Sequence, residues 1–334
     1  MSTAESDRRS GQRAVLEIDH LTVELAGGRR AARVVDDVSL AVFPREIVGL
    51  IGESGSGKTM TALSILRLLP RAASIAGGEI RLGGASLTSM SEAELRRIRG
   101  RRIAMIPQNP MSAMNPVLRI GAQVGEPYVL HRGVRWTDAV AQAVRLLRDV
   151  HLPLPEERAV EYPHQFSGGM QQRAMTAMAI ALEPQLLIAD EPTTALDVTI
   201  QAQVLRLLLE IRDRHGTATL LITHDLGVIA EMCDWVYVMY AGRILEQGSV
   251  ERIFARPSHP YTQALMRATP TVDATDADLA SIPGSIPSPF ELPAGCRFAD
   301  RCPSRFERCE REPLLLDVEA SHSARCWLLE DGRE

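Results

Sequence analysis

Short apolar runs alternate along this chain with segments in which apolar residues recur every three or four positions. Residues 15–25 and 34–42 show the alternating, β-branched pattern of strands, and 26–30 between them predicts a turn. Further apolar runs predict strands at 46–51, 186–189 and 218–223 and a hairpin at 235–240 and 243–247. Helical spacing predicts helices at 60–69, 137–150, 168–182 and 200–214, and a Ser91–Glu94 capping box opens a short basic helix. Strands that alternate with helices indicate an α/β core with a mainly parallel sheet.

The pattern changes after residue 250, where proline becomes frequent. Between residues 257 and 293 prolines stand at positions 257, 260, 270, 283, 287, 289 and 293. We interpret this stretch as a linker into a small separate tail. The expected organisation is a disordered leader over 1–14, a main domain over 15–250 and an extension over 251–334.

Composition excludes several classes of protein. The chain has 334 residues, of which 45% are hydrophobic and 24% charged, as in ordinary globular proteins. A net charge of −5 argues against a nucleic-acid binder, which usually carries a basic excess. The longest apolar run, 174–182, is too short to span a bilayer, and 1–12 lacks the apolar core of a secretory signal. We therefore expect a cytosolic protein that meets a membrane only through a partner.

A glycine-rich segment is the first candidate binding site along the chain. It matches the pattern G-x-x-x-x-G-K-[ST] and lies between a predicted strand and a predicted helix. Its residues are Gly52, Glu53, Ser54, Gly55, Ser56, Gly57, Lys58 and Thr59. Such a P-loop points backbone N–H groups at phosphate oxygens, with help from the helix N-terminus. Lys58 is expected to reach the β- and γ-phosphates and Thr59 to bind Mg²⁺, and Lys58 is the only lysine among the 37 Lys and Arg residues.

A second, apolar strand ends in two acids, Asp190 and Glu191. Many buried strands end in an acid, so the pattern gains meaning only from the P-loop before it. In that context Asp190 is expected to bind the Mg²⁺ ion and Glu191 to act as the base that orients the attacking water.

The segment 166–173, Phe-Ser-Gly-Gly-Met-Gln-Gln-Arg, resembles the signature motif of ATP-binding cassette (ABC) ATPases. The family pattern is Leu-Ser-Gly-Gly-Gln, so Phe166 and Met170 depart from it. Other family landmarks follow in order, namely the Q-loop residue Gln108, the D-loop residue Asp197 and the switch histidine His224. The family usually has an aromatic residue that stacks on adenine near position 25, where this chain has Leu25, so the adenine contact stays unassigned.

The resemblance implies an α/β fold with a RecA-like P-loop core, an antiparallel β subdomain and a helical subdomain at about 109–170. It further implies a pair of ATPase subunits that hold ATP between the P-loop of one and the signature segment of the other. That segment comprises Ser167, Gly168, Gly169, Met170 and Gln171. Gln108 would join Thr59 and Asp190 at Mg²⁺, and His224 would stabilise the γ-phosphate during hydrolysis of ATP to ADP and phosphate.

Three stretches, 108–116, 162–166 and 259–265, resemble oligopeptide and dipeptide importers. The last reads His-Pro-Tyr-Thr-Gln-Ala-Leu and is similar to the motif of that group's C-terminal extension. The resemblance implies an ATPase subunit on the cytoplasmic face of the membrane that drives peptide uptake. Its partners would be a second ATPase, two integral membrane permeases and an extracytoplasmic substrate-binding protein. Nickel importers share these features, so a nickel or other small-solute importer is the alternative.

Four of the five cysteines lie near the C-terminus: Cys296, Cys302, Cys309 and Cys326. In a reducing compartment such a group indicates metal or cofactor ligation before disulfides. Long spacings without C-x-x-C favour a [4Fe–4S] cluster, which some peptide importers with a similar tail carry, over a structural zinc site. Zinc and free thiols or disulfides stay open, and Cys233 is expected to be a small buried side chain in a helix.

Two other functions are alternatives: a nucleic-acid-associated ATPase and an export ATPase. ABC ATPases also serve DNA repair and translation, and the five arginines within 96–102 would suit nucleic acid; a solvated helix face is the simpler interpretation. The acidic net charge and the peptide-importer tail argue against nucleic acid as a partner. An export ATPase is disfavoured because exporter cassettes are often fused to membrane helices, and this sequence contains none.

Overall fold

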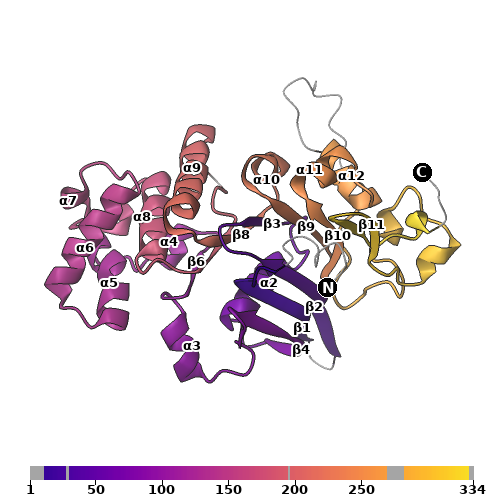
Figure 1. Ribbon diagram of the computed structural model, residues 1–334, viewed down its shortest axis with the longest axis horizontal. Helices are drawn as coiled ribbons and strands as arrows, with labels where there is room; N and C mark the ends of the chain where they lie inside the picture. The colour runs from indigo at the N-terminus through magenta and orange to yellow at the C-terminus, as the bar shows by residue number, and fades with distance from the viewer. Residues whose placement is uncertain (1–10, 28–29, 195, 269–281, 331–334) are drawn as a thin grey trace. The chain divides into compact units, whose positions relative to one another are not determined.

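The computed structural model of the protein describes residues 11–27, 30–194, 196–268 and 282–330 (Figure 1). The chain divides into two compact units. The first comprises Met1–Phe43, Ile47–Thr88 and Thr223–Glu334, and the second comprises Pro44–Glu46 and Ser89–Ile222. Most of the predicted leader lies outside the described residues. In the described ranges, no helix has the length and apolarity that crossing a membrane requires.

The first unit contains an antiparallel sheet with the strand order β2-β1-β4-β5. Its strands are β1 (Leu16–Gly27), β2 (Arg30–Val42), β4 (Ala73–Leu82) and β5 (Ala85–Ser86). Alternate residues of β1, including Leu16, Ile18 and Val23, are buried, as expected of a strand with one apolar face. The predicted pair of strands around a turn is thus confirmed, whereas β4 had no clear sequence pattern.

The same unit contains a mixed sheet with the order β11-β12-β10-β9-β3. Strands β3 (Ile47–Ile51) and β9 (Trp235–Tyr240) are parallel, whereas β10 (Arg243–Ser249), β12 (His322–Ala324) and β11 (Leu316–Glu319) continue antiparallel. The predicted hairpin of β9 and β10 is therefore confirmed. The described part of this unit also contains the helices α2 (Lys58–Leu66), α10 (Leu226–Met232), α11 (Val250–Ala255) and α12 (Pro260–Arg267).

The expectation of a separate tail behind a linker is wrong. Helices α11 and α12 occupy the start of the expected linker, and β12 pairs directly with β10. The remaining tail consists of the 3-10 turns Ala299–Arg301, Glu307–Glu310 and Trp327–Leu329. Tail residues share one apolar cluster with β9 and α12. In it, Phe298 meets the Tyr240 ring edge-on at a centroid distance of 5.4 Å and the Tyr261 ring at a tilt at 5.3 Å. The extension thus forms part of the first unit's core.

The second unit contains three parallel strands, β6 (Ile103–Ile106), β7 (Leu186–Asp190) and β8 (Ala218–Thr223), in the order β8-β7-β6. All residues of β7 and β8 are buried, as their continuous apolar runs predict. Helices α8 (Gly168–Ile180) and α9 (Val198–His215) and helix α3 (Glu92–Ile98) fall where their spacing predicts them. Helix α3 begins with the predicted capping box of Ser91 and Glu94.

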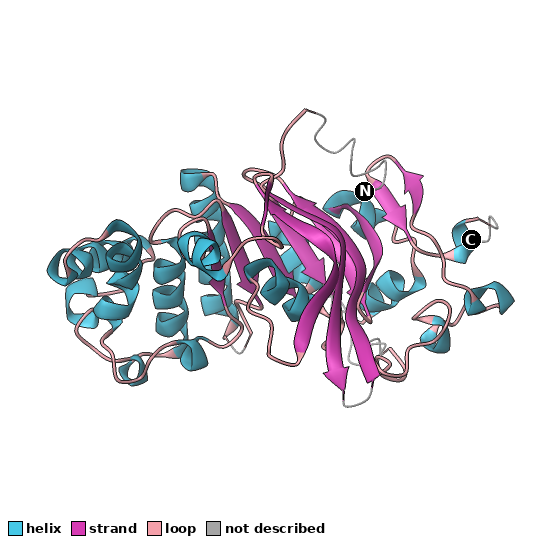
Figure 2. Cartoon of the chain, turned by 90° about the horizontal axis from the view of Figure 1, so that it is seen from below, coloured by secondary structure: helices cyan, strands magenta, loops and turns pink. Residues whose placement is uncertain are grey.

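The rest of this unit is helical, and Figure 2 shows its helices in cyan. It comprises α4 (Pro110–Ala113), α5 (Ile120–Arg132), α6 (Trp136–Asp149), α7 (Pro155–Arg158) and the 3-10 turn Pro163–Gln165. Helix α6 was predicted, and its buried residues Ala139, Ala143 and Leu147 repeat every four positions. Helix α5 was missed. The predicted bounds of the helical subdomain and of the extension stay predictions.

Candidate functional site

The P-loop connects the buried strand β3 to helix α2 within the first unit. Two of its glycines are required by their surroundings. Gly52 and Gly57 have φ angles of 155° and 109°, and Gly57 is the N-cap of α2. A Cβ atom on Gly52 would lie 2.0 Å from the Met239 carbonyl oxygen, and one on Gly57 would lie 2.7 Å from that of Val34. Only glycine lets the loop lie this close to the neighbouring strands.

The ammonium group of Lys58 lies inside this loop. Its Nζ donates hydrogen bonds to the carbonyl oxygens of Gly52, at 2.6 Å, and Glu53, at 3.0 Å. The side chain is only 5% exposed. A compact ammonium with rotatable donors can exchange such carbonyl partners for phosphate oxygens, which a planar guanidinium cannot do in so small a loop.

Two side chains from distant positions hold the first variable residue of the loop, Glu53. The Glu53 N–H donates to the Tyr261 hydroxyl at 2.9 Å, and the Glu53 carboxylate accepts two hydrogen bonds from Arg301 at 2.6 and 3.0 Å. Sequence reasoning missed both contacts. Tyr261 belongs to the 259–265 motif, which was identified as a family marker without a structural role, and no sequence pattern pointed to Arg301.

His224 lies in the first unit, on the exposed loop between β8 and α10. Its neighbours are fixed through hydrogen bonds to the backbone. The Asp225 carboxylate caps α10 by accepting the N–H of Gly227 at 2.8 Å, and the Asp225 N–H donates to the Thr223 hydroxyl at 3.0 Å. Hydrogen bonds therefore hold the backbone on the C-terminal side of His224, and His224 itself is exposed.

The predicted base and two predicted Mg²⁺ ligands lie together in the second unit. Asp190, at the end of β7, is 1% exposed, and Glu191 follows it with a φ angle of 47°. The Gln108 amide donates to Glu191 Oε2 at 2.8 Å, and the Thr194 hydroxyl donates to the same oxygen at 2.9 Å. A left-handed backbone costs a residue with a side chain about 1–3 kcal/mol. Two donors on one oxygen fix the orientation of the Glu191 carboxylate, and Thr194 was not predicted.

The signature segment opens helix α8 in the second unit. Ser167 is the N-cap, its hydroxyl accepts the Met170 N–H, and Ser167 and Gly168 are exposed at the helix N-terminus. A Cβ atom on Gly169 would lie 2.7 Å from Ile200 Cγ2 of α9, so this glycine permits close helix packing. Gln171, predicted as an ATP contact, is 3% exposed, and its amide donates to the Pro163 carbonyl oxygen at 2.8 Å.

The D-loop residue Asp197 is the N-cap of α9. Its carboxylate accepts the Ile200 N–H at 2.9 Å. The predicted Mg²⁺ ligands divide between the units, with Thr59 in the first and Gln108 and Asp190 in the second. Their hydroxyl, amide and carboxylate oxygens are hard donors, which fit Mg²⁺. In the described ranges, no group of three or more His, Cys, Asp or Glu side chains is arranged to hold a metal ion.

The four tail cysteines are free thiols that influence one another electrostatically. Burial raises the pKa of Cys296 to about 12, and the nearby Cys309, Cys326 and Cys302 add to this rise. Burial also raises the pKa of Cys302 and of Cys326, and the backbone N–H groups of Ser304 and Leu328 oppose these rises. Thiols are the donor type that an iron–sulfur cluster uses, but among the residues that the structure describes these four are not arranged as a preformed metal site. Cys233, by contrast, is the half-buried C-cap of α10 rather than a residue within the helix.

Two family models match the chain. The model described as "ABC transporter" matches residues 35–194, and the model described as "Oligopeptide/dipeptide transporter, C-terminal region" matches residues 245–309.

Named relatives are similar over nearly the whole chain. A protein of Sinorhizobium fredii named "Probable peptide ABC transporter ATP-binding protein" is 49% identical over 316 residues, covering 94% of each chain. The oligopeptide transport ATP-binding protein of Bacillus subtilis is 44% identical over 319 residues, covering 95% of this chain and 97% of the relative.

Solved structures of ATP-binding cassettes are also similar. A dimeric cassette in a post-hydrolysis state, bound to ADP and Pi, aligns with a TM-score of 0.64 and 25% identity over 70% of this chain and 98% of that chain. Another dimeric bacterial ABC transporter cassette aligns with a TM-score of 0.64 and 26% identity. The predicted α/β fold of an ABC ATPase is thereby confirmed. The chain belongs to the ABC transporter ATP-binding proteins that carry an oligopeptide/dipeptide transporter C-terminal region, and it is an ATPase of this family.

Proposed function

We propose that this chain hydrolyses ATP to drive the import of di- or oligopeptides across the cytoplasmic membrane. The observation that carries the proposal is the combination, in one chain, of a P-loop that holds Lys58 with the 259–265 segment, whose Tyr261 binds that loop. Relatives that cover nearly the whole chain are named for peptide or oligopeptide transport. A nickel or other small-solute importer is the alternative, and a nucleic-acid ATPase finds no further support.

The proposed chemistry is transfer of the γ-phosphoryl group to water. Lys58 and the loop amides stabilise the negative charge that spreads over the phosphate oxygens. Glu191, oriented by Gln108 and Thr194, positions the attacking water and accepts its proton, and His224 stabilises the γ-phosphate. Mg²⁺, held by Thr59, Asp190 and Gln108, would neutralise charge on the β- and γ-phosphates.

We further propose that two ATPase subunits act together, identical or related. The exposed N-terminus of α8 supports this, because Ser167, Gly168 and Gly169 can present backbone N–H groups to a nucleotide bound by another subunit. Two integral membrane permeases would dock near the Q-loop at the cytoplasmic face of the membrane. The neighbouring Val117 and Leu118 are 75% and 45% exposed, which suits an apolar contact. An extracytoplasmic substrate-binding protein would deliver the peptide.

Replacement of the proposed base tests the ATPase chemistry. Glu191→Gln keeps the size and hydrogen-bonding capacity of the side chain but removes its basicity, so we expect normal ATP affinity and a kcat lower by about 10²–10³-fold. Glu156→Gln, which alters an exposed ion pair with Arg148, is the matched control. Steady-state phosphate release and calorimetric ATP binding measure both quantities. Near-normal turnover in the Glu191 variant would remove Glu191 from this role.

We also propose that Cys296, Cys302, Cys309 and Cys326 hold a [4Fe–4S] cluster, with zinc as the alternative. Cys296, Cys302 and Cys309 share one apolar cluster, and thiols are the donors that an iron–sulfur cluster uses, which supports this proposal. Protein purified without oxygen should be brown and contain about four irons per chain, as the cluster formula requires. Cys296→Ser should lose the iron and Cys233→Ser should retain it. Colourless, iron-free wild-type protein that contains zinc would establish the alternative.

A further inference from the structure

The C-terminal extension contributes a side chain to the nucleotide site. We propose that Arg301 is a positioning residue of the P-loop, which fixes Glu53 so that the loop keeps the arrangement that binds phosphate. The proposal rests on ATP hydrolysis at this P-loop and is independent of which solute is transported.

Every N–H of the Arg301 guanidinium has an acceptor. Nη1 donates to Glu53 Oε2 at 2.6 Å and to the Tyr240 hydroxyl at 3.3 Å, and Nη2 donates to Glu53 Oε1 at 3.0 Å and to the Ile282 carbonyl at 3.2 Å. Nε donates to the Pro283 carbonyl oxygen at 2.8 Å. These contacts use all five donors of the planar group and leave the side chain 6% exposed. A guanidinium held in this way presents a rigid fork to the carboxylate.

Glu53, in turn, is held at each of its polar groups. Its N–H donates to the Tyr261 hydroxyl at 2.9 Å, and its carbonyl oxygen accepts from Lys58 Nζ at 3.0 Å and from the Ser56 N–H at 3.2 Å. Its carboxylate is bound by Arg301. The residue that fixes the Lys58 ammonium is therefore itself fixed by two residues of the region beyond 250. Release of Glu53 would loosen the start of the loop.

The charge of Glu53 gives Arg301 a second effect. A free carboxylate on the P-loop would repel a nucleotide that carries several negative charges. The bidentate pair with Arg301 neutralises this carboxylate and directs it into the extension. Loss of Arg301 alone therefore leaves an uncompensated negative charge on the loop, which is worse for anion binding than loss of both partners.

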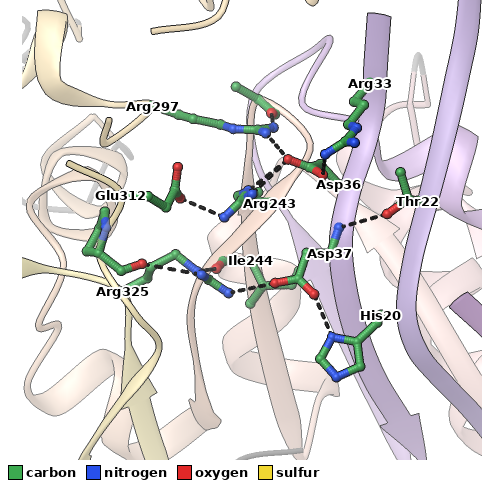
Figure 3. Close-up of polar contacts among 12 residues, drawn as sticks. His20, Thr22, Arg33, Asp36, Asp37, Arg243, Ile244, Arg297, Glu312 and Arg325 are labelled. Carbon is green, nitrogen blue, oxygen red and sulfur yellow. Dashed lines mark hydrogen bonds and ion pairs between the residues drawn. The ribbon is translucent and has the colours of Figure 1, made fainter. Parts of the chain in front are cut away.

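A second arginine of the extension, Arg297, supports the P-loop indirectly, through the turn between β9 and β10. Arg297 donates to the Ala241 carbonyl oxygen and pairs with Asp36, on which Arg243 also converges (Figure 3). The adjoining Gly242 N–H donates to the Ser56 carbonyl oxygen at 2.8 Å.

These two arginines flank cysteines of the tail. Arg297 follows Cys296, and Arg301 precedes Cys302. The segment between these cysteines therefore supports the P-loop at both ends, directly at Glu53 and through the β9–β10 turn at Ser56. Arg297 and Arg301 are each 6% exposed, and burial of two cations is costly unless their partners are fixed nearby.

Nucleotide binding by single variants tests the proposal. We expect Arg301→Ala to raise the Kd for ATP about tenfold and to raise KM more than it lowers kcat, because the substitution acts on the binding loop. Arg305→Ala is the matched control. Arg305 lies on the same segment but pairs with Asp300 and is 48% exposed, so its loss should leave the Kd unchanged.

A double variant separates the effect of the freed charge from the effect of positioning. Adding Glu53→Ala to Arg301→Ala removes the freed carboxylate but does not restore the contact that fixes the loop, so it should recover only part of the lost affinity. An unchanged Kd in Arg301→Ala, or a double variant that binds ATP as tightly as the wild type, would overturn the proposal. Should Arg301→Ala not fold, Arg301→Lys keeps the charge without the fork and should raise the Kd about threefold; no rise would contradict the proposal.

The wild-type protein separates failure of the proposed function from failure of the role of Arg301. If the wild type fails to bind or hydrolyse ATP, the proposed function fails. If the wild type binds ATP and Arg301→Ala binds it equally well, only the role of Arg301 fails.

Discussion

Lys58 combines a property of the sequence with a property of the structure. It is the only lysine of the chain, and its ammonium lies within the P-loop against two carbonyl oxygens. The preference of this chain for arginine over lysine ends at the one position where a compact ammonium is needed.

This arrangement predicts that bound ATP protects Lys58 from chemical modification. A lysine-directed reagent has one side-chain target, and we expect ATP at ten times its Kd to slow modification of Lys58 about tenfold, because the free site becomes scarce. Peptide mapping by mass spectrometry measures the rate. The amino terminus serves as the internal control, since ATP should not change its labelling. Equal labelling of Lys58 with and without ATP would place the nucleotide elsewhere.

Residues with a local signature were predictable, and residues defined by distant contacts were not. Gln108, Asp190 and Glu191 were expected from strand ends and family landmarks, and the structure brings them together. The contact of Arg301 was not predicted, because its partner Glu53 is 248 positions away and one arginine among many carries no pattern. Their ion pair exists only after the chain has folded back on the loop.

At the scale of elements, helix α12 shows how the 259–265 motif is built. His259 is its N-cap, with Nδ1 accepting the Tyr261 N–H at 3.0 Å, while the His259 N–H donates to Glu246 at 3.0 Å. The ring is 1% exposed, and burial lowers its pKa to about 4, although Glu246 opposes this shift. The cap fixes Tyr261, which reaches Glu53.

The buried imidazole predicts a pH dependence of stability. The unfolded chain gains a proton near the ordinary pKa of 6.5, and the folded chain only near 4, so His259 contributes fully above pH 6.5 and its contribution falls as the pH drops toward 4. Between pH 7.5 and 5 the loss should be about 2 kcal/mol. His259→Asn keeps a capping acceptor without titrating and should remove this part of the loss.

Urea unfolding of both proteins at the two pH values measures the difference. His164→Asn is the control, because His164 is exposed. If His259→Asn loses as much stability as the wild type on acidification, His259 does not titrate as proposed.

Elements with a strong apolar period were predicted well, and α5 shows why others were not. Its segment contains Gly121, Gly125 and Pro127, which are poor helix formers. In the structure, Cβ atoms on Gly121 and Gly125 would lie 2.8 and 2.7 Å from the carbonyl oxygens of Ala159 and Ala139. Close packing against neighbouring helices, rather than propensity, therefore stabilises α5.

At the scale of the whole molecule, the extension is the main difference between expectation and structure. Proline-rich composition indicated a linker and a separate tail, but β12 pairs with β10 and Phe298 packs on Tyr240 and Tyr261. A proline-rich composition indicates only that the local backbone is stiff and the segment polar. It does not report whether a distant surface offers an apolar partner, and here β9 and α12 offer one.

The sequence by itself determined the chemistry and the family: the P-loop with its single lysine, the acidic strand end, the signature segment and the 259–265 motif. These features are contiguous stretches whose backbone geometry and hydrogen bonding are set within a few residues. Only the tertiary structure decided that the cysteine-bearing extension binds the P-loop through Tyr261 and Arg301. Hydrogen bonds and ion pairs between distant positions depend on the path of the whole chain, which no local pattern encodes.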